Sequence, residues 1–343
     1  MNNKLSQLKH SYYLYIIIWV KYFTFKKLFN LFFNLYECKT KKIIIKSVPF
    51  IVNIDVSNIC VLNCPLCPTG RRDPQKKGIM NFEKFKDIFD KVKDYLFDVK
   101  LYNWGEPFLC KDIFKIVDYC HKNNVGVRLH SNLNYYTEEI LENIVKHKID
   151  YLHLSIDGYS QEAYEYYRRS GDIGKVFKGL EKIQEYKKKL KNRFPIIHWG
   201  YLINNKNKDE IEKASNYAKK IGVEVFEAFN MCLFTTLGDR YSREKYTEFL
   251  SEVSEENKCS SWESEGACSF PWIELVINPN SSFYPCCIMY EDGDIFGWFN
   301  NSQDIHQILN SEILVESRKL FKNKNYKTKC ATPCNRCAWY IKL

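Results

Sequence analysis

The sequence predicts an α/β fold built from parallel strand–helix units, followed by a small cysteine-rich domain. Short apolar segments alternate with longer amphipathic segments from residue 50 to residue 229, which is the pattern of parallel β/α units. The chain has 343 residues, enough for a large core and a second, smaller module. Of its 14 cysteines, several are clustered at gaps of two and three residues, which is metal-ligand spacing.

The predicted strands follow the apolar segments in order. They are Phe50–Val56, Asp98–Asn103, Val125–His130, Tyr151–Ile156, Ile196–Ile203 and Val223–Phe229. The predicted helices between them are Phe82–Leu96, Asp112–Asn123, Thr137–His147, Ile173–Lys191 and Asn207–Ile221. The first helix is predicted because its apolar residues recur at gaps of three and four, which makes one apolar face. Six strands are fewer than the eight of a closed barrel, so a partial (β/α)6 barrel and a doubly wound sheet both fit.

Three domains are predicted from this organisation. Residues 1–47 form an N-terminal helical segment, residues 48–235 the strand–helix core, and residues 236–343 a linker and the cysteine-rich domain. In the last domain we expect a hairpin of Trp272–Ile277 and Ser282–Pro285, and a helix near Asp304–Lys322.

The N-terminal segment, residues 11–37, is rich in Tyr, Phe, Trp and Lys. Its apolar run from Tyr12 to Val20 is too short to span a bilayer alone, and no small-residue cleavage site follows it. Two interpretations remain open: a helical lid packed on the core, or a helix that lies in a membrane interface. We therefore expect a cytoplasmic protein, with peripheral membrane contact through this segment under the second interpretation.

The formal net charge is +10, and the basic residues are spread along predicted surface helices, as in residues 187–191. No nucleic-acid recognition motif accompanies this charge, so no nucleic-acid partner is predicted. Clustered cysteines without a secretory signal argue against a secreted disulfide protein.

The most informative residues follow the first predicted strand, in the spacing Cys60-x3-Cys64-x2-Cys67. A 4Fe-4S cluster normally takes four cysteines, so three thiolates leave one iron open to a ligand that is not protein. Other polar residues follow the next three strands. These are Trp104-Gly105-Glu106-Pro107, Ser131-Asn132 and Ser155-Ile156-Asp157-Gly158. Because the active site of a parallel β/α fold lies at the carboxyl ends of its strands, these residues are predicted to share one site.

This combination resembles the radical S-adenosylmethionine (radical SAM) superfamily over about residues 48–230. The resemblance implies a partial (β/α)6 TIM-like barrel, a SAM-binding 4Fe-4S cluster on Cys60, Cys64 and Cys67, and a SAM cofactor. It also implies cofactor contacts from Gly105, Glu106 (to the methionine amino group), Ser131, Ser155 and Arg168 (to the SAM carboxylate). Leu66 departs from the family, which usually has an aromatic residue there beside the adenine.

The C-terminal cysteines resemble the SPASM or twitch module of many radical SAM enzymes. That resemblance implies an auxiliary 4Fe-4S cluster on Cys268, Cys286, Cys334 and Cys337, with Cys330 and Cys287 as substitutes or spares. A structural zinc ion held by four thiolates is the rival interpretation. Cys38, Cys110, Cys120 and Cys232 are expected to be buried small hydrophobes, and Cys259 is undecided.

By the same resemblance, the protein cleaves SAM reductively and removes hydrogen from a substrate C–H bond. It would take its electron from an external donor such as flavodoxin or ferredoxin. We expect oxidation of a small polar metabolite such as a sugar, aminocyclitol or glycan precursor. The alternatives are a maturase of ribosomal peptides and, outside catalysis, an iron–sulfur electron carrier. No catalytic residue is predicted, and Glu291, Asp292 and Asp294 are only candidates. His130, His153 and His198 are expected to be core or pocket residues.

Overall fold

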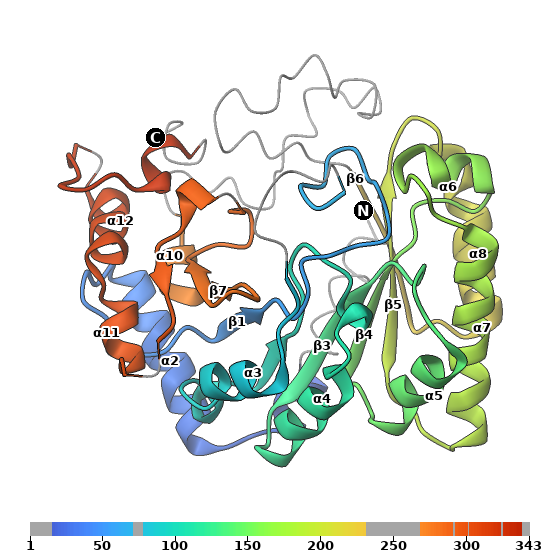
Figure 1. Cartoon of the computed structure of the whole chain (residues 1–343), viewed down its shortest axis with the longest axis horizontal. Helices are drawn as coiled ribbons and strands as arrows, with labels where there is room; N and C mark the ends of the chain where they lie inside the picture. Colours follow the sequence, from blue (N-terminus) through green and yellow to red (C-terminus); the bar gives the residue numbers. More distant parts are fainter. Residues whose placement is uncertain are drawn as a thin grey trace.

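The computed structural model describes residues 16–70, 78–230, 268–290, 292–300, 302–323 and 325–337. Its described strands form one sheet in the order β6-β5-β4-β3-β2-β1-β7-β8-β9 (Figure 1). The core strands are β1 (Ile51–Ile54), β2 (Asp98–Lys100), β3 (Gly126–Ser131), β4 (Tyr151–Ser155), β5 (Ile196–Ile203) and β6 (Val225–Asn230). They are parallel and lie in sequence order. A doubly wound sheet would reverse its strand order at a switch point, so the partial barrel is the correct alternative.

Helices follow the strands and cover the outer face of the sheet (Figure 1). They are α3 (Phe82–Phe89), α4 (Ile113–Lys122), α5 (Glu138–Lys146), α6 (Gln161–Tyr167), α7 (Ile173–Lys189) and α8 (Ile211–Ile221). Several begin at a side chain that accepts a hydrogen bond from the backbone of the first turn. These N-cap residues are Asn81, Thr137, Ser160 and Asp172, all of types that favour this position.

Three predicted elements were wrong in detail. The helix that begins at Phe82 ends at Phe89 and is followed by a short 3-10 turn, Lys93–Tyr95, although Val92 and Leu96 are fully buried as the stripe predicts. Asp90 ends it, because its carboxylate accepts from Lys93 Nζ at 2.7 Å and from Tyr119 Oη at 2.8 Å.

The C-terminal helix is divided into α11 (Ile305–Leu309) and α12 (Glu312–Lys322). Asn310 between them turns its amide toward Ile45, accepting from its N–H and donating to its carbonyl, both at 2.9 Å. The predicted strand from Trp272 begins two residues later, because Phe270–Ile273 is a helical turn, α10, in which the Trp272 indole donates to the Lys42 carbonyl.

The predicted hairpin is present and extends the core sheet. β7 (Glu274–Ile277) pairs parallel with β1, and β8 (Ser282–Tyr284) and β9 (Gly297–Trp298) continue antiparallel. The cysteine-rich region therefore shares a sheet with the barrel.

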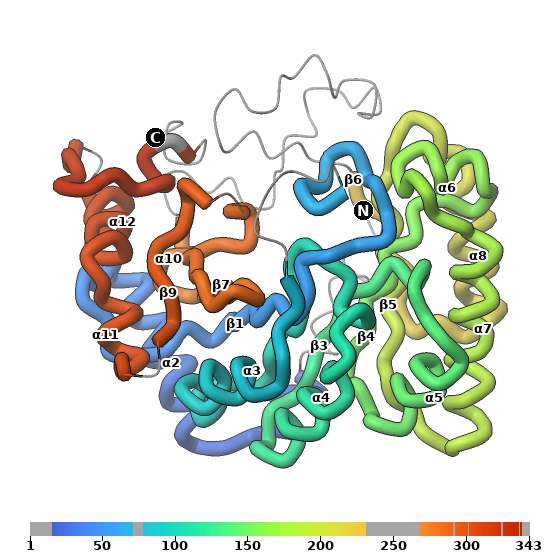
Figure 2. The backbone as a smooth tube through the Cα atoms, in the orientation of Figure 1, coloured from blue at the N-terminus to red at the C-terminus, as the bar shows by residue number. Residues whose placement is uncertain are grey.

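The described N-terminal residues pack beneath the barrel, at the amino ends of its strands. Tyr22 and Lys21 both bond to the Asp150 carboxylate just before β4, and Trp19 Nε1 donates to Asp98 at the start of β2. The next helix is α2 (Phe25–Lys39), and Figure 2 shows the chain leading from it into β1. One face of this segment therefore packs on the core, as the lid interpretation expects. Within the described residues, no helix has the length and apolar character needed to cross a bilayer.

Candidate functional site

The loop after β1 brings Cys60, Cys64 and Cys67 together. Cys64 is buried and the other two are half-buried. The Cys64 and Cys67 thiols add to the raised pKa of Cys60, and the Cys67 thiol adds to that of Cys64. Burial raises the pKa of Cys60 to about 12 and that of Cys64 to about 11. The loop is held to the end of α6 by a hydrogen bond from Asn63 N to Arg169 O at 3.0 Å. The three predicted cluster ligands therefore converge at the carboxyl end of the sheet.

Two donors approach these sulfurs. Asn132 Nδ2 lies 3.4 Å from Cys60 Sγ, and Arg168 Nη1 lies 4.0 Å from Cys64 Sγ. Donors and a positive charge beside thiolates suit a cluster, because hydrogen bonds to the sulfurs and net charge tune its potential. The sequence placed Asn132 at this edge of the sheet but did not predict its contact with Cys60.

The loop after β2 touches the cysteine loop at Gly105. A Cβ atom at this position would lie 1.7 Å from the Ser57 carbonyl oxygen, so only glycine fits. The next residue, Glu106, donates its backbone N–H to Ile59 O at 2.8 Å. These contacts fix the Gly-Glu-Pro segment against the predicted cluster loop.

Glu106 is completely buried, and its carboxylate ties the ends of β2 and β3 together. It accepts from Ser131 Oγ at 2.9 Å, Asn132 N at 3.0 Å and Phe108 N at 3.3 Å. Burial raises its pKa to about 7, and these donors oppose the rise. The structure thus unites Glu106 and Ser131. A carboxylate has about four acceptor sites, so one remains for a ligand ammonium group.

Arg168 is held by a partner that sequence reasoning did not assign. Its Nε donates to Asp157 Oδ2 at 2.5 Å, and Asp157 Oδ1 accepts from Leu202 N at 2.8 Å. Asp157 is buried and follows β4 directly. Ser155 ends β4, two residues before it. The Arg168 fork is thereby aimed at the cysteine loop, with its Nη groups available to a carboxylate.

Leu66 lies in a small apolar cluster beside the cysteine loop. Its neighbours in this cluster are Leu62, Tyr166, Tyr167, Leu202 and the three loop cysteines. Two tyrosines of α6 therefore stand near the position where the family usually has an aromatic residue.

The C-terminal cysteines form a second group. Burial raises the pKa of Cys268, and the Cys334 and Cys337 thiols raise it further. A hydrogen bond with Cys287 raises the pKa of Cys286, as do burial and, to a smaller extent, the Cys268 thiol. Burial raises the pKa of Cys330, with Glu312 and Glu316 adding to the rise. Cys268, Cys286, Cys287, Cys334 and Cys337 thus lie near one another, and the choice of four ligands among them stays a prediction.

Neither of the two cysteine groups forms a preformed site for a single metal ion among the described residues. Among the described residues, no three His, Cys, Asp or Glu side chains are placed to hold a single metal ion. A zinc ion needs all its thiolates at about 2.3 Å, whereas a 4Fe-4S cube takes one cysteine on each iron.

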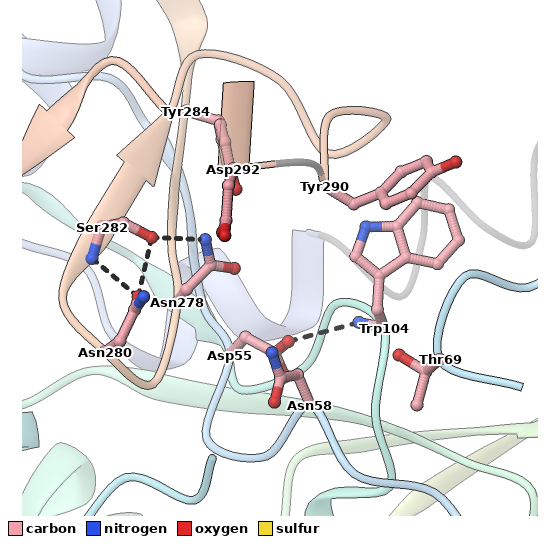
Figure 3. Close-up of a pocket in the computed structure, with 10 residues that line it drawn as sticks. All are labelled: Asp55, Asn58, Thr69, Trp104, Asn278, Asn280, Ser282, Tyr284, Tyr290 and Asp292. Atoms are coloured by element: carbon pink, nitrogen blue, oxygen red, sulfur yellow. Dashed lines mark hydrogen bonds between the residues drawn. The ribbon is translucent and has the colours of Figure 1, made fainter. Parts of the chain in front are cut away.

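A polar pocket lies where the loops after β1 and β2 face the β7–β8 hairpin (Figure 3). Its enclosed cavity is small, about 20 Å³, and the space beyond it is open to solvent. Its lining is Asp55, Asn58, Thr69, Trp104, Asn278, Asn280, Ser282, Tyr284, Tyr290 and Asp292. Of the acidic candidates, Asp292 lines this pocket, Asp294 is buried, and Glu291 lies outside the described residues, as do Cys232 and Cys259.

Asp55 is the buried acid of this pocket. Its Oδ2 accepts from Trp104 N at 3.4 Å, while Oδ1 has no hydrogen-bond partner among the described residues. Burial raises its pKa to about 7. Trp104 Nε1 and Asn103 Nδ2 are likewise buried without a partner in the described structure. Buried polar atoms are normally paired, so these three are suited to a ligand.

The three histidines lie side by side on β3, β4 and β5. His130, His153 and His198 occupy the same register, with ring centroids 4.2 and 4.6 Å apart. Burial lowers the pKa of His130 and His153. They are buried or half-buried barrel residues, in agreement with the prediction.

Two family models match the chain. The radical SAM superfamily model matches residues 54–218, and the SPASM iron–sulfur cluster-binding domain matches residues 268–338. Among curated relatives, a GTP 3',8-cyclase of Clostridium botulinum is 29% identical over 180 residues, which are 51% of this chain and 54% of the relative. The AdoMet-dependent heme synthase of Methanosarcina barkeri is 24% identical over 184 residues, 53% and 51% of the two chains. The chain thus spans about half the length of the curated relatives it matches.

Solved structures share the fold at low identity. Streptococcus suis SuiB bound to its precursor peptide SuiA has a TM-score of 0.61 at 14% identity, covering 90% of this chain and 73% of SuiB. The structure of anSMEcpe with bound AdoMet has a TM-score of 0.56 at 19% identity, covering 86% and 88% of the two chains. With the sequence motifs, the barrel and the two family models in agreement, this chain belongs to the radical SAM superfamily and carries a C-terminal SPASM iron–sulfur cluster-binding domain.

Proposed function

We propose that this enzyme oxidises a small polar metabolite, such as a sugar, aminocyclitol or glycan precursor, at a carbon that bears a hydroxyl group. The polar pocket that Asp55 and Trp104 line carries this proposal. It offers an unpartnered acceptor on Asp55 and an unpartnered donor on Trp104, which match the hydroxyl groups of such a substrate. Ligand-binding sites usually contain a small number of polar groups, and the precise placement of these groups fixes the orientation of the ligand.

Cys60, Cys64 and Cys67 would hold the first cluster, and Cys268, Cys286, Cys334 and Cys337 the second. When bound, these clusters and SAM supply the radical that removes hydrogen from the substrate carbon and an acceptor for one electron. The residues of the chain have other tasks. Glu106 and Arg168 would orient SAM through its ammonium and carboxylate groups. Asp55 would accept the hydroxyl proton that is released as the carbinol becomes a carbonyl, because its raised pKa lies close to neutral pH.

The second candidate is a maturase of ribosomal peptides. It is favoured by similarity to the mycofactocin maturase MftC of Mycolicibacterium smegmatis, 23% identical over 177 residues. An electron-carrier function is set aside, because the chain belongs to a superfamily of enzymes.

A substrate assay separates the two candidates. Reduced enzyme with SAM would be incubated with a panel of sugars and aminocyclitols or with short peptides, and 5'-deoxyadenosine measured. We expect a polyhydroxylated compound to raise its formation above the substrate-free rate, and Asp55→Asn to abolish this rise while the substrate-free rate persists. Asp209→Asn, at an exposed position on the 3-10 turn Lys208–Glu210, serves as the matched control. Stimulation by peptides alone would overturn the proposal.

A further inference from the structure

Helix α2 is reversed in polarity relative to an ordinary surface helix. Helices that cover a core normally bury an apolar stripe and expose their polar face. On α2 the buried positions are mostly polar or charged. They are Lys27, Asn30, Leu31, Asn34 and Glu37.

Each polar residue on this inner face has specific partners. Asn30 donates to Val48 O and accepts from Val48 N, both at 2.9 Å, and Asn34 Nδ2 donates to Trp272 O at 3.0 Å. The Glu37 carboxylate accepts from the backbone of Lys46 and Ser47 at 2.9 and 3.0 Å. Lys27 Nζ donates to Tyr22 O at 3.0 Å. These bonds fix the rotation of α2 about its axis.

The outer face carries a row of large apolar side chains. Phe25, Phe29, Phe32 and Tyr36 follow at gaps of four, three and four residues and are 82%, 73%, 62% and 52% exposed. Phe33 joins the row, with ring centroids 6.2 Å from Phe29 and 6.4 Å from Tyr36. A continuous exposed apolar patch marks an interaction site more often than scattered residues do.

The charge around this row points to its partner. Residues 16–46 contain seven lysines and one acidic residue, Glu37, which is buried. Lys39, Lys42 and Lys46 are exposed near the end of the row, and Lys42 Nζ lies 6.0 Å from the Tyr36 ring. Aromatic residues bordered by lysines are suited to an anionic bilayer surface, where both kinds of contact add.

A second copy of the chain would fit this face poorly. A two-fold contact brings the same patch of both subunits together, and residues 16–46 offer these lysines no exposed acidic residue to pair with. We infer that the outer face of α2 docks on an anionic lipid bilayer, with the helix lying in the interface plane. Its 15 residues give about 22 Å of contact length. Under this inference the inner face of α2 packs on the core, as the lid interpretation expects, and its outer face contacts the membrane, as the interfacial interpretation expects.

Co-sedimentation of the full-length holoenzyme with vesicles tests this inference. The probes are vesicles of phosphatidylcholine alone and of phosphatidylcholine mixed with phosphatidylglycerol. We expect binding to the anionic vesicles, release by salt because surface attraction is screened, and a partition coefficient at least about tenfold lower on neutral vesicles.

Two variants remove the two contributions separately. Phe25→Ser/Phe29→Ser/Phe32→Ser removes apolar contact, and Lys39→Glu/Lys42→Glu reverses charge; each should lower partitioning about tenfold or more. Trp298→Ser, at a residue 57% exposed, and Lys188→Glu/Lys189→Glu, on exposed positions of α7, are matched controls that should change it less than about twofold. Unchanged iron content shows that a variant is folded. If the triple phenylalanine variant does not fold, the lysine variant alone tests whether α2 binds the vesicles.

Three results would overturn the inference. The first is that the parent protein does not bind anionic vesicles. The second is that the folded α2 variants bind vesicles as strongly as the parent does. The third is that the parent forms a dimer, the phenylalanine variant is monomeric, and neither protein binds vesicles.

Discussion

Replacing Asp55 by Asn should stabilise the protein while impairing its activity. The carboxyl group has its pKa raised from 3.8 to about 7 because it is fully buried. The folded state therefore holds a proton that the unfolded chain loses above about pH 4, and stability falls as pH rises between these two values. Above the folded-state pKa both states are ionised, and the destabilisation is complete.

The size of this effect follows from the two pKa values. Since one pKa unit corresponds to about 1.36 kcal/mol, the carboxylate costs about 2 kcal/mol at pH 5.5 and about 4 kcal/mol at pH 8. Asn keeps the acceptor for Trp104 N and cannot ionise, so Asp55→Asn should raise the free energy of unfolding by these amounts.

Urea unfolding of the anaerobic holoprotein at both pH values measures this gain, with Asp209→Asn as the exposed control. A gain that is the same at both pH values, or a loss of stability at pH 8, would refute the reasoning. A stabilised variant that has also lost substrate-stimulated SAM cleavage would identify Asp55 as a functional residue, since functional sites often sacrifice stability.

The remaining predictions concern the two cysteine groups and the loops between them. Gly105→Ala should weaken SAM binding at least about tenfold in calorimetry, because the new Cβ would clash with Ser57 O. Gly293→Ala, whose Cβ would have no heavy atom within 4 Å, is the control and should bind SAM normally. Equal affinities would show that the contact between the β2 loop and the cysteine loop is not needed for SAM binding. Cys334→Ala should lower the iron content from about eight to about four per chain, and Cys330→Ala should leave it unchanged. The opposite outcome would show that Cys330 is the cluster ligand and Cys334 the spare cysteine. Glu106→Ala should lower SAM affinity about tenfold or more, since a hydrogen bond to a charged group is worth roughly 1.5–3 kcal/mol; unaltered affinity would mean that Glu106 is only a structural tie between β2 and β3.

The sequence was sufficient for the strand–helix order and for the residues at the strand ends, because periodicity and ligand spacing are local properties. Its periodicity alone could not choose between a partial barrel and a doubly wound sheet, since strand order is set by long-range pairing; the resemblance to the radical SAM superfamily made that choice. The sequence also missed Asp55, and it did not predict the contact of Asn132 with Cys60, because both depend on neighbours distant in the chain. The break at Asn310 escaped prediction for the same reason, as its partner is Ile45.

The pairing of β7 with β1 has a consequence for electron movement. Four consecutive residue pairs, from Ile51 with Glu274 to Ile54 with Ile277, join the barrel to the C-terminal domain. Domains joined only by linkers are expected to move relative to each other, but here a hinge motion would break the hydrogen bonds of a shared ladder. If the two cysteine groups hold clusters as proposed, this shared ladder would keep the separation of the clusters constant. Electron transfer to the second cluster would then not depend on a movement of the C-terminal domain relative to the barrel.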